Sequence, residues 1–147
     1  MYAKILVPTD GSKLSDKAVK EASKLAKLTG AALLLLHVRE SYSASPSAES
    51  APVSSLQKRK IEADVRAAGT EVLEAAVKIA SGRGIEAATR LVISSSPFEE
   101  ILKVAKKESC DLIVMASHGR RGIASLLMGS ETQKVLTHTR RPVLVVR

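Results

Sequence analysis

Hydrophobic residues along this chain follow two spacings that alternate from one end to the other. Short apolar runs, typical of buried β-strands, are separated by longer segments in which apolar residues recur every three or four positions, as on one face of a helix. The runs are AKILV from Ala3, AALLLLHV from Ala31, EAATRLVI from Glu86, DLIVMAS from Asp111 and RPVLVVR from Arg141. This alternation predicts an α/β fold, an open five-stranded parallel sheet with helices on both faces and right-handed crossovers.

Four amphipathic segments are predicted to be the connecting helices. In the first, Leu14, Ala18, Ala22 and Leu25 share one face, and Gly30 stands where the helix should end. The apolar face of the second is predicted to consist of Ile61, Val65, Ala68, Val72, Ala76 and Ile79.

The last two helices carry capping signals at their starts. Ser96 is predicted to cap the third helix, with Pro97 at the first helical position and Glu99 completing a capping box. Ser130 and Gln133 are predicted to cap the fourth.

The chain of 147 residues is predicted to form a single domain, residues 1–147. It contains one long connection, a Ser-, Ala- and Pro-rich loop at about residues 41–55. We interpret this loop as a flexible linker, with a mobile lid near the ligand as the alternative.

Amino-acid composition limits the classes of partner and the cellular compartment that we expect. A net charge of +8 indicates an anionic partner, and an aromatic content of 2% argues against a single-stranded nucleic-acid platform. The longest apolar run, Ala31 to Leu36, is too short to cross a bilayer, and no signal-peptide pattern is visible. The lone Cys110, expected to be a small buried hydrophobe, excludes an intramolecular disulfide and a cysteine-built metal site. These features favour a cytoplasmic protein.

A glycine-rich segment follows the fourth strand, at the sheet edge where ligands of such folds bind. Gly119 removes a Cβ atom that would obstruct a phosphate or ribose, and Gly129 does the same before a helix start, where free N–H groups suit phosphate. Arg120 and Arg121 add positive charge there. The alternative is that Gly129 shapes a turn and Ser130 merely caps the helix.

The same segment lacks the signals of a phosphate-cleaving loop. Gly129 is followed by Ser-Glu rather than by Lys-Ser or Lys-Thr, and no Gly-x-Gly-x-x-Gly follows the first strand. No nucleophile, base and orienting group stand out, and His118 is expected to face solvent. We therefore expect binding without rapid catalysis, with no catalytic or metal-ligating residues.

Four motifs give the chain a family resemblance: ILVPTDGS, LLLLHV, DLIVMASHGRRGIASLLMGS and RPVLVV. Together they resemble the universal stress protein family, whose nucleotide-binding branch carries Gly-x-x-Gly, nine residues, then Gly-Ser or Gly-Thr. Here Gly119, Gly129 and Ser130 match and Ala116 replaces the first glycine. The resemblance implies a Rossmann-like, adenine nucleotide alpha hydrolase-like fold.

The resemblance also implies a nucleotide site. The adenine and ribose side would consist of Pro8, Thr9, Asp10 and Val38. The phosphate side would consist of Ala116, Gly119, Gly129, Ser130 and Glu131, with Arg120 adding charge. The expected ligand is ATP, or AMP or a cyclic nucleotide, with Mg carried on the phosphates. Asp10 could face that metal or the ribose, although Asp-Gly is also a common turn pair.

The resulting prediction is a dimeric stress-response module, paired through the edge strand from Pro142 to Val146. Alternatives are a slow ATPase or nucleotidyl-transfer enzyme and an interaction protein without a nucleotide. A further alternative is nucleic-acid binding through a stripe of lysines, which we otherwise interpret as a solvated face: Lys13, Lys17, Lys20, Lys24 and Lys27. Neither nucleic acid nor a membrane is the expected partner, and a protein partner is not identified.

Overall fold

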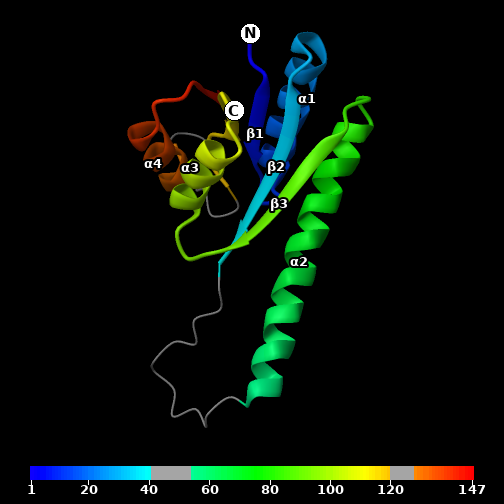
Figure 1. The fold of residues 1–147 in the computed structure, drawn as a ribbon, viewed down its shortest axis with the longest axis vertical. Helices are drawn as coiled ribbons and strands as arrows, with labels where there is room; N and C mark the ends of the chain where they lie inside the picture. Colours follow the sequence, from blue (N-terminus) through cyan, green and yellow to red (C-terminus); the bar gives the residue numbers. More distant parts are fainter. Residues whose placement is uncertain (41–53, 120–127) are drawn as a thin grey trace.

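The computed structural model describes residues 1–40, 54–119 and 128–147. Their elements follow the chain in the order β1 (Lys4–Pro8), α1 (Lys13–Thr29), β2 (Ala32–Arg39), α2 (Ser55–Ser81), β3 (Ala87–Ile93), α3 (Pro97–Lys107), β4 (Leu112–Ala116), α4 (Ser130–His138) and β5 (Val143–Val146). The predicted α/β class and strand–helix alternation are confirmed (Figure 1). The Ser-rich loop lies outside the described residues up to residue 53, as does Arg120.

The strands form one parallel sheet in the order β3-β2-β1-β4-β5. The chain builds outward from β1 to β3 and then returns to add β4 on the other side of β1. The strand order therefore reverses between β1 and β4. In open parallel sheets this reversal leaves a crevice at the carboxyl ends of the two strands.

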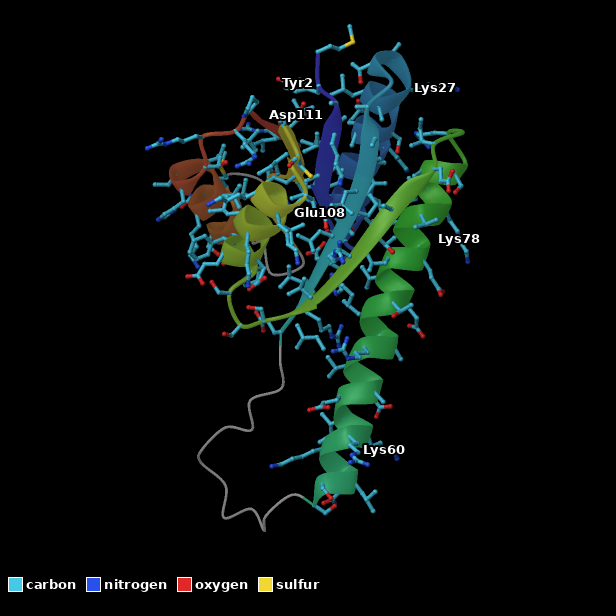
Figure 2. The ribbon with its side chains drawn as sticks, viewed as in Figure 1. Tyr2, Lys27, Lys60, Lys78, Glu108 and Asp111 are labelled. Carbon is cyan, nitrogen blue, oxygen red and sulfur yellow. The ribbon has the colours of Figure 1, made fainter. Side chains whose placement is uncertain are left out.

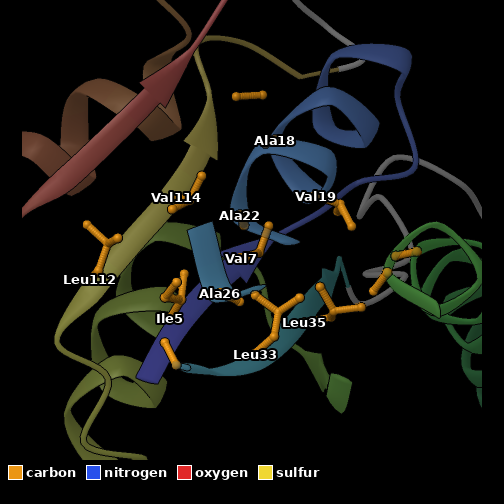
Figure 3. Close-up of a cluster of buried hydrophobic side chains, with 14 of the residues drawn as sticks. Ile5, Val7, Ala18, Val19, Ala22, Ala26, Leu33, Leu35, Leu112 and Val114 are labelled. Carbon is orange, nitrogen blue, oxygen red and sulfur yellow. The ribbon is translucent and has the colours of Figure 1, made fainter. Parts of the chain in front are cut away.

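Two hydrophobic clusters hold the helices to the two faces of the sheet. Ile5 and Val7 of β1 pack with α1 and α2, whereas Leu6 between them packs with α3 and α4. Helix α1 contributes small buried residues, among them Ala18 and Ala22, which let it lie close to the strands (Figure 3). The near-continuous apolar runs of β1 and β2 follow from this burial on both faces.

The apolar face predicted for α2 is only partly correct. The helix buries a neighbouring stripe of Gly69, Leu73, Ala76 and Ala80, whereas Ile61 is exposed. With 27 residues the helix is about 40 Å long. Strands β2 and β3, with eight and seven residues, span only about 25 Å. The first turns of α2 therefore extend past the sheet (Figure 1), and residues 55–64 are exposed.

Helix ends confirm one sequence signal and correct two. Gly30 ends α1, as predicted, and the structure shows that it does so in the left-handed conformation. Ser96 makes no side-chain capping bond; the Phe98 N–H donates instead to Glu131 Oε2 at 2.8 Å. Helix α4 begins at Ser130 with Gly129 before it, so Ser130 is not the cap.

Side chains also tie the first strand to its neighbours at the amino ends of the strands. The carboxylate of Asp111 accepts the Ala3 N–H at 2.8 Å and the Lys4 N–H at 3.0 Å, and these bonds lower the pKa of Asp111. Glu108, which is labelled with Asp111 in Figure 2, accepts from Lys4 Nζ at 3.0 Å and from Arg90. Both bonds lower the pKa of Glu108, and the bond from Lys4 has the larger effect.

Cys110 is buried as expected, and burial raises the pKa of its thiol. None of the helices in the described part of the chain combines the length and the apolar character that a bilayer span requires.

Candidate functional site

A cavity of about 670 Å³ lies at the carboxyl ends of β1, β2 and β4, at the point where the strand order reverses. It is bounded by the segments that leave these strands and by the starts of α3 and α4. Nine of the ten predicted site residues line it: Pro8, Thr9, Asp10, Val38, Ala116, Gly119, Gly129, Ser130 and Glu131. The tenth, Arg120, lies outside the described residues.

The loop that leaves β1 is held by its own hydrogen bonds. Thr9 is buried, and its Oγ1 lies 3.1 Å from Ser15 Oγ and accepts the Gly11 N–H. Asp10 Oδ1 accepts the Ser12 N–H at 3.0 Å, which is the turn that an Asp-Gly pair predicts. These bonds fix the direction of the Asp10 carboxylate without a ligand.

The hydrogen-bond ladder between β1 and β2 stops just before the cavity. The Thr9 N–H donates to the Leu36 carbonyl at 2.8 Å, and a parallel ladder would continue from the Val38 N–H to the Thr9 carbonyl. The Thr9 carbonyl instead accepts Nδ1 of His37 at 2.7 Å. Among the described residues no backbone hydrogen bond reaches Val38 from the β1 side. Val38 therefore presents a peptide N–H and C=O, a donor and an acceptor, to the cavity.

The two walls of the crevice meet where Asp10 lies against Gly119. A Cβ atom placed on Gly119 would come within 2.5 Å of Asp10 Oδ2. A larger residue at this position would therefore force the Asp10 carboxylate to shift.

Position 129, on the other side of the cavity, requires glycine for a similar steric reason. Its N–H donates to the Ser117 carbonyl at 2.6 Å, and a Cβ atom on it would lie 2.9 Å from the Cα of His118. Its φ is −59°, which any residue can adopt. Close approach of the protein backbone, rather than an unusual conformation, therefore requires glycine at this position.

The start of α4 borders the cavity. Ser130, Glu131 and Thr132 all line the cavity, and N–H groups in the first turn of a helix have no acceptor within that helix. The Thr132 hydroxyl donates to the Ala116 carbonyl at 2.9 Å, which fixes this helix start to the end of β4. Such a helix start carries partial positive charge and suits an anion.

Charged side chains of both signs border the cavity. Asp10, Glu40 and Glu131 are acidic, and Arg39 is basic. The carboxylate of Glu131 accepts from the Phe98 N–H through Oε2 and from Lys134 Nζ at 2.9 Å through Oε1. The negative charge of Glu131 is thereby offset by Lys134 and by the N-terminal end of α3. Within the described residues, no three His, Cys, Asp or Glu side chains gather in a way that could hold a metal ion.

Sequence reasoning did not single out His37. This residue is 5% exposed, lines the cavity and links the end of β2 to the loop after β1. The signal available in the sequence was a polar residue next to the end of an otherwise apolar run, LLLLHV. His118, expected to face solvent, is instead half-buried at the cavity, with Nδ1 lying 3.2 Å from Ser117 Oγ.

Comparison with known proteins gives consistent matches along the whole chain. Residues 1–147 match the model of the Universal stress protein family. Universal stress protein YxiE of Bacillus subtilis is 35% identical, and the alignment covers 100% of both chains. Universal stress protein MJ0577 of Methanocaldococcus jannaschii is 33% identical, with 100% of this chain and 96% of that protein covered.

Solved structures match the fold as well. The structure of MJ0577 superimposes with a TM-score of 0.81 and 30% identity, covering 99% of this chain and 96% of that one. A universal stress protein in complex with cAMP gives a TM-score of 0.72 at 24% identity, with 99% and 97% covered. One from Archaeoglobus fulgidus in complex with dAMP gives 0.66 at 22%, with 99% and 98% covered.

Proposed function

The chain belongs to the universal stress protein family, and from this premise we propose that it is a regulatory module that binds an adenine nucleotide between β1 and β4. The observation that carries the proposal is the pairing of two features across one cavity. The Val38 peptide supplies a donor and an acceptor on one side, and the start of α4 supplies N–H groups on the other.

The Val38 peptide matches the edge of adenine. Adenine presents an amino donor next to a ring-nitrogen acceptor, which complements a peptide C=O and N–H of the same residue. Guanine presents a carbonyl acceptor next to an N–H donor, so both of its groups would meet their own kind at Val38. A buried mismatch of this type is strongly rejected because polar groups are left unpaired.

The phosphates would lie at the start of α4. The N–H groups of Ser130 and Glu131 would donate to phosphate oxygens there, and the partial charge of the helix adds to that attraction. Asp10, held against Gly119, would accept the ribose hydroxyls or face a metal ion carried by the phosphates. ATP is the proposed ligand, and AMP and cyclic AMP are the alternatives.

The structures with cAMP and dAMP are 24% and 22% identical to this chain, and at this identity they show only that the fold is shared. The ligand class proposed for this chain therefore depends on the cavity itself.

We also propose that binding proceeds without rapid turnover and that two copies pair through β5. The segment after β4 lacks the Lys-Ser or Lys-Thr of phosphate-cleaving loops. β5 lies at the end of the sheet order, and Leu144 on it is 43% exposed. An apolar edge strand of this kind favours pairing with another chain.

The test combines mass spectrometry of ligand released from the purified protein with calorimetry using ATP, AMP, cAMP and GTP. We expect an adenine nucleotide to bind and GTP to bind at least about tenfold more weakly, the factor that corresponds to about 1.4 kcal/mol. Asp10→Ala should weaken ATP binding, whereas Asp64→Ala, on the exposed part of α2, should not. Equal affinity for ATP and GTP, or no adenine nucleotide binding at millimolar concentration, would refute the proposal.

A further inference from the structure

We propose that His37 is a positioning residue of this cavity: its imidazole engages the Thr9 carbonyl and thereby leaves the Val38 N–H available to the ligand. The ligand in this statement is the adenine nucleotide of the proposed function. The hydrogen-bonding role of His37 is a property of the protein without ligand and can be tested separately.

The direction of the Val38 peptide follows from the two strands that flank β2. Leu36 accepts the Thr9 N–H and therefore faces β1, whereas Arg39 accepts the Ser94 N–H at 2.9 Å and faces β3. Peptide groups alternate between the two sides along a parallel strand, so Val38 faces the same side as Leu36. Its natural partner there is the Thr9 carbonyl, the acceptor of the missing rung.

The His37 ring draws that carbonyl away from the rung. His37 follows Leu33 and Leu35 at two-residue spacing, so its side chain lies on the same face of the sheet, toward α1 and α2. A carbonyl can only accept, so Nδ1 carries the proton and donates to Thr9 across 2.7 Å. A bond made from one face pulls the carbonyl oxygen out of the plane of the sheet, away from Val38.

Helix α2 holds the ring in place. Gly69 of α2 lies over it: a Cβ atom on Gly69 would come 3.4 Å from His37 Cδ2 and 2.6 Å from Leu91 Cδ1. With 5% of its surface exposed, the ring has little freedom to leave Thr9. The bond to the Thr9 carbonyl is therefore a fixed part of the site rather than one of several ring positions.

Removal of the ring should return the Thr9 carbonyl to the ladder. The β1–β2 pairing would then gain one rung, and the Val38 N–H would be engaged within the sheet. The base would lose its donor while the rest of the cavity stayed in place. This outcome differs from simple loss of packing, which would lower stability without protecting the Val38 amide.

The first measurement is amide hydrogen exchange of the ligand-free parent protein. Leu36 and Val38 lie two residues apart on β2, so opening of this strand affects both amides. We expect the Val38 amide to exchange at least about a hundredfold faster than the Leu36 amide, since only the latter is in the ladder. A Val38 amide as protected as that of Leu36 would overturn the inference without any variant.

The second measurement uses a matched pair of variants, His37→Leu and His37→Asn. The two side chains have similar branched shapes, but Asn carries an amide nitrogen on Cγ, the position of Nδ1 in histidine. We expect His37→Leu to protect the Val38 amide and to weaken ATP binding by about tenfold. His37→Asn should retain the parent exchange pattern and most of the affinity, and thermal midpoints control for folding.

The outcomes separate the inference from the proposed function. If the two variants behave alike in both exchange and affinity, His37 is a packing residue and the inference is wrong. If the parent binds no adenine nucleotide, the proposed function fails, but the exchange rates of Val38 still decide the role of His37. If His37→Leu does not fold, the exchange comparison in the parent can still overturn the inference, because it needs no variant.

Discussion

A Cβ atom on Gly129 would lie 2.9 Å from the Cα of His118. The same glycine donates its N–H to the Ser117 carbonyl at 2.6 Å, so the start of α4 is in direct contact with the end of β4. This contact forms without any bound ligand. Gly129 therefore has a structural reason to be glycine that precedes any reason supplied by a ligand.

The first prediction follows from this contact. Gly129→Ala should lower the free energy of unfolding of the ligand-free protein by about 1–3 kcal/mol, as overpacking against backbone does. Urea unfolding measures this directly. Ser130→Ala is the control and should change stability by less than about 0.5 kcal/mol, because Ser130 makes no capping bond. A Gly129→Ala protein as stable as the parent would show that the contact is not close in solution.

The second prediction concerns the start of α3. Glu131→Ala should cost about 1 kcal/mol, the usual effect of losing a helix cap, because Glu131 accepts the Phe98 N–H. Ser96→Ala should cost much less, since Ser96 makes no side-chain capping bond. Chemical denaturation of both variants checks the order. If Ser96→Ala proved the more destabilising, the local capping box predicted from the sequence would be correct after all.

The third prediction concerns Ala116, which the resemblance described above matches to the first glycine of the nucleotide-binding motif. The residue is 8% exposed and belongs to the hydrophobic cluster beneath α1. Ala116→Gly should therefore lower stability by about 0.5–1 kcal/mol, the cost of glycine in a strand. We expect ATP affinity to change by less than about threefold, which is less than the tenfold change that corresponds to about 1.4 kcal/mol. Calorimetry showing a large gain in affinity would mean that the methyl group obstructs the ligand. Ala88→Gly, on the exposed part of β3, is the backbone control.

The fourth prediction is a pH dependence of stability at Asp111. Two backbone N–H bonds lower the pKa of its carboxyl in the folded protein. Its stabilising contribution is therefore complete above the unfolded pKa of about 3.9 and is lost as the pH falls through the lower folded value. Urea unfolding should be measured from about pH 6 to about pH 3, the range in which carboxyl groups titrate. Over this range the free energy of unfolding should fall less for Asp111→Asn than for the parent. Asp64→Asn should follow the parent.

The fifth prediction tests the proposed dimer. Leu144→Lys places a charge on the edge strand at a side chain that is 43% exposed, so the fold should survive. Sedimentation at micromolar concentration should show a dimer for the parent and a monomer for the variant. Leu56→Lys, at a residue that is 74% exposed on α2, should leave the dimer intact. A monomeric parent, or a dimer unaffected by Leu144→Lys, would contradict pairing through β5.

The sequence by itself determined the order and type of the elements. Strands buried on both faces need nearly continuous apolar runs, as in LLLLHV, and helices packed on one face need apolar residues at helical spacing. The end of α1 at Gly30 was also readable, because only glycine adopts the left-handed conformation at little cost. Once the strands were known to be parallel, their carboxyl ends had to gather the segments that contain Thr9, Val38 and Gly119.

Only the tertiary structure decided which residues contact one another across those segments. Glu131 accepts the N–H of Phe98, 33 residues earlier in the chain, and His37 bonds to a carbonyl 28 residues before it. Ile61 follows the helical period but lies where α2 has passed the end of the sheet. The physical reason is the same in each case. Sequence periodicity records how strongly a position is buried, whereas these contacts depend on strand register and helix placement, which are set by packing of the whole sheet.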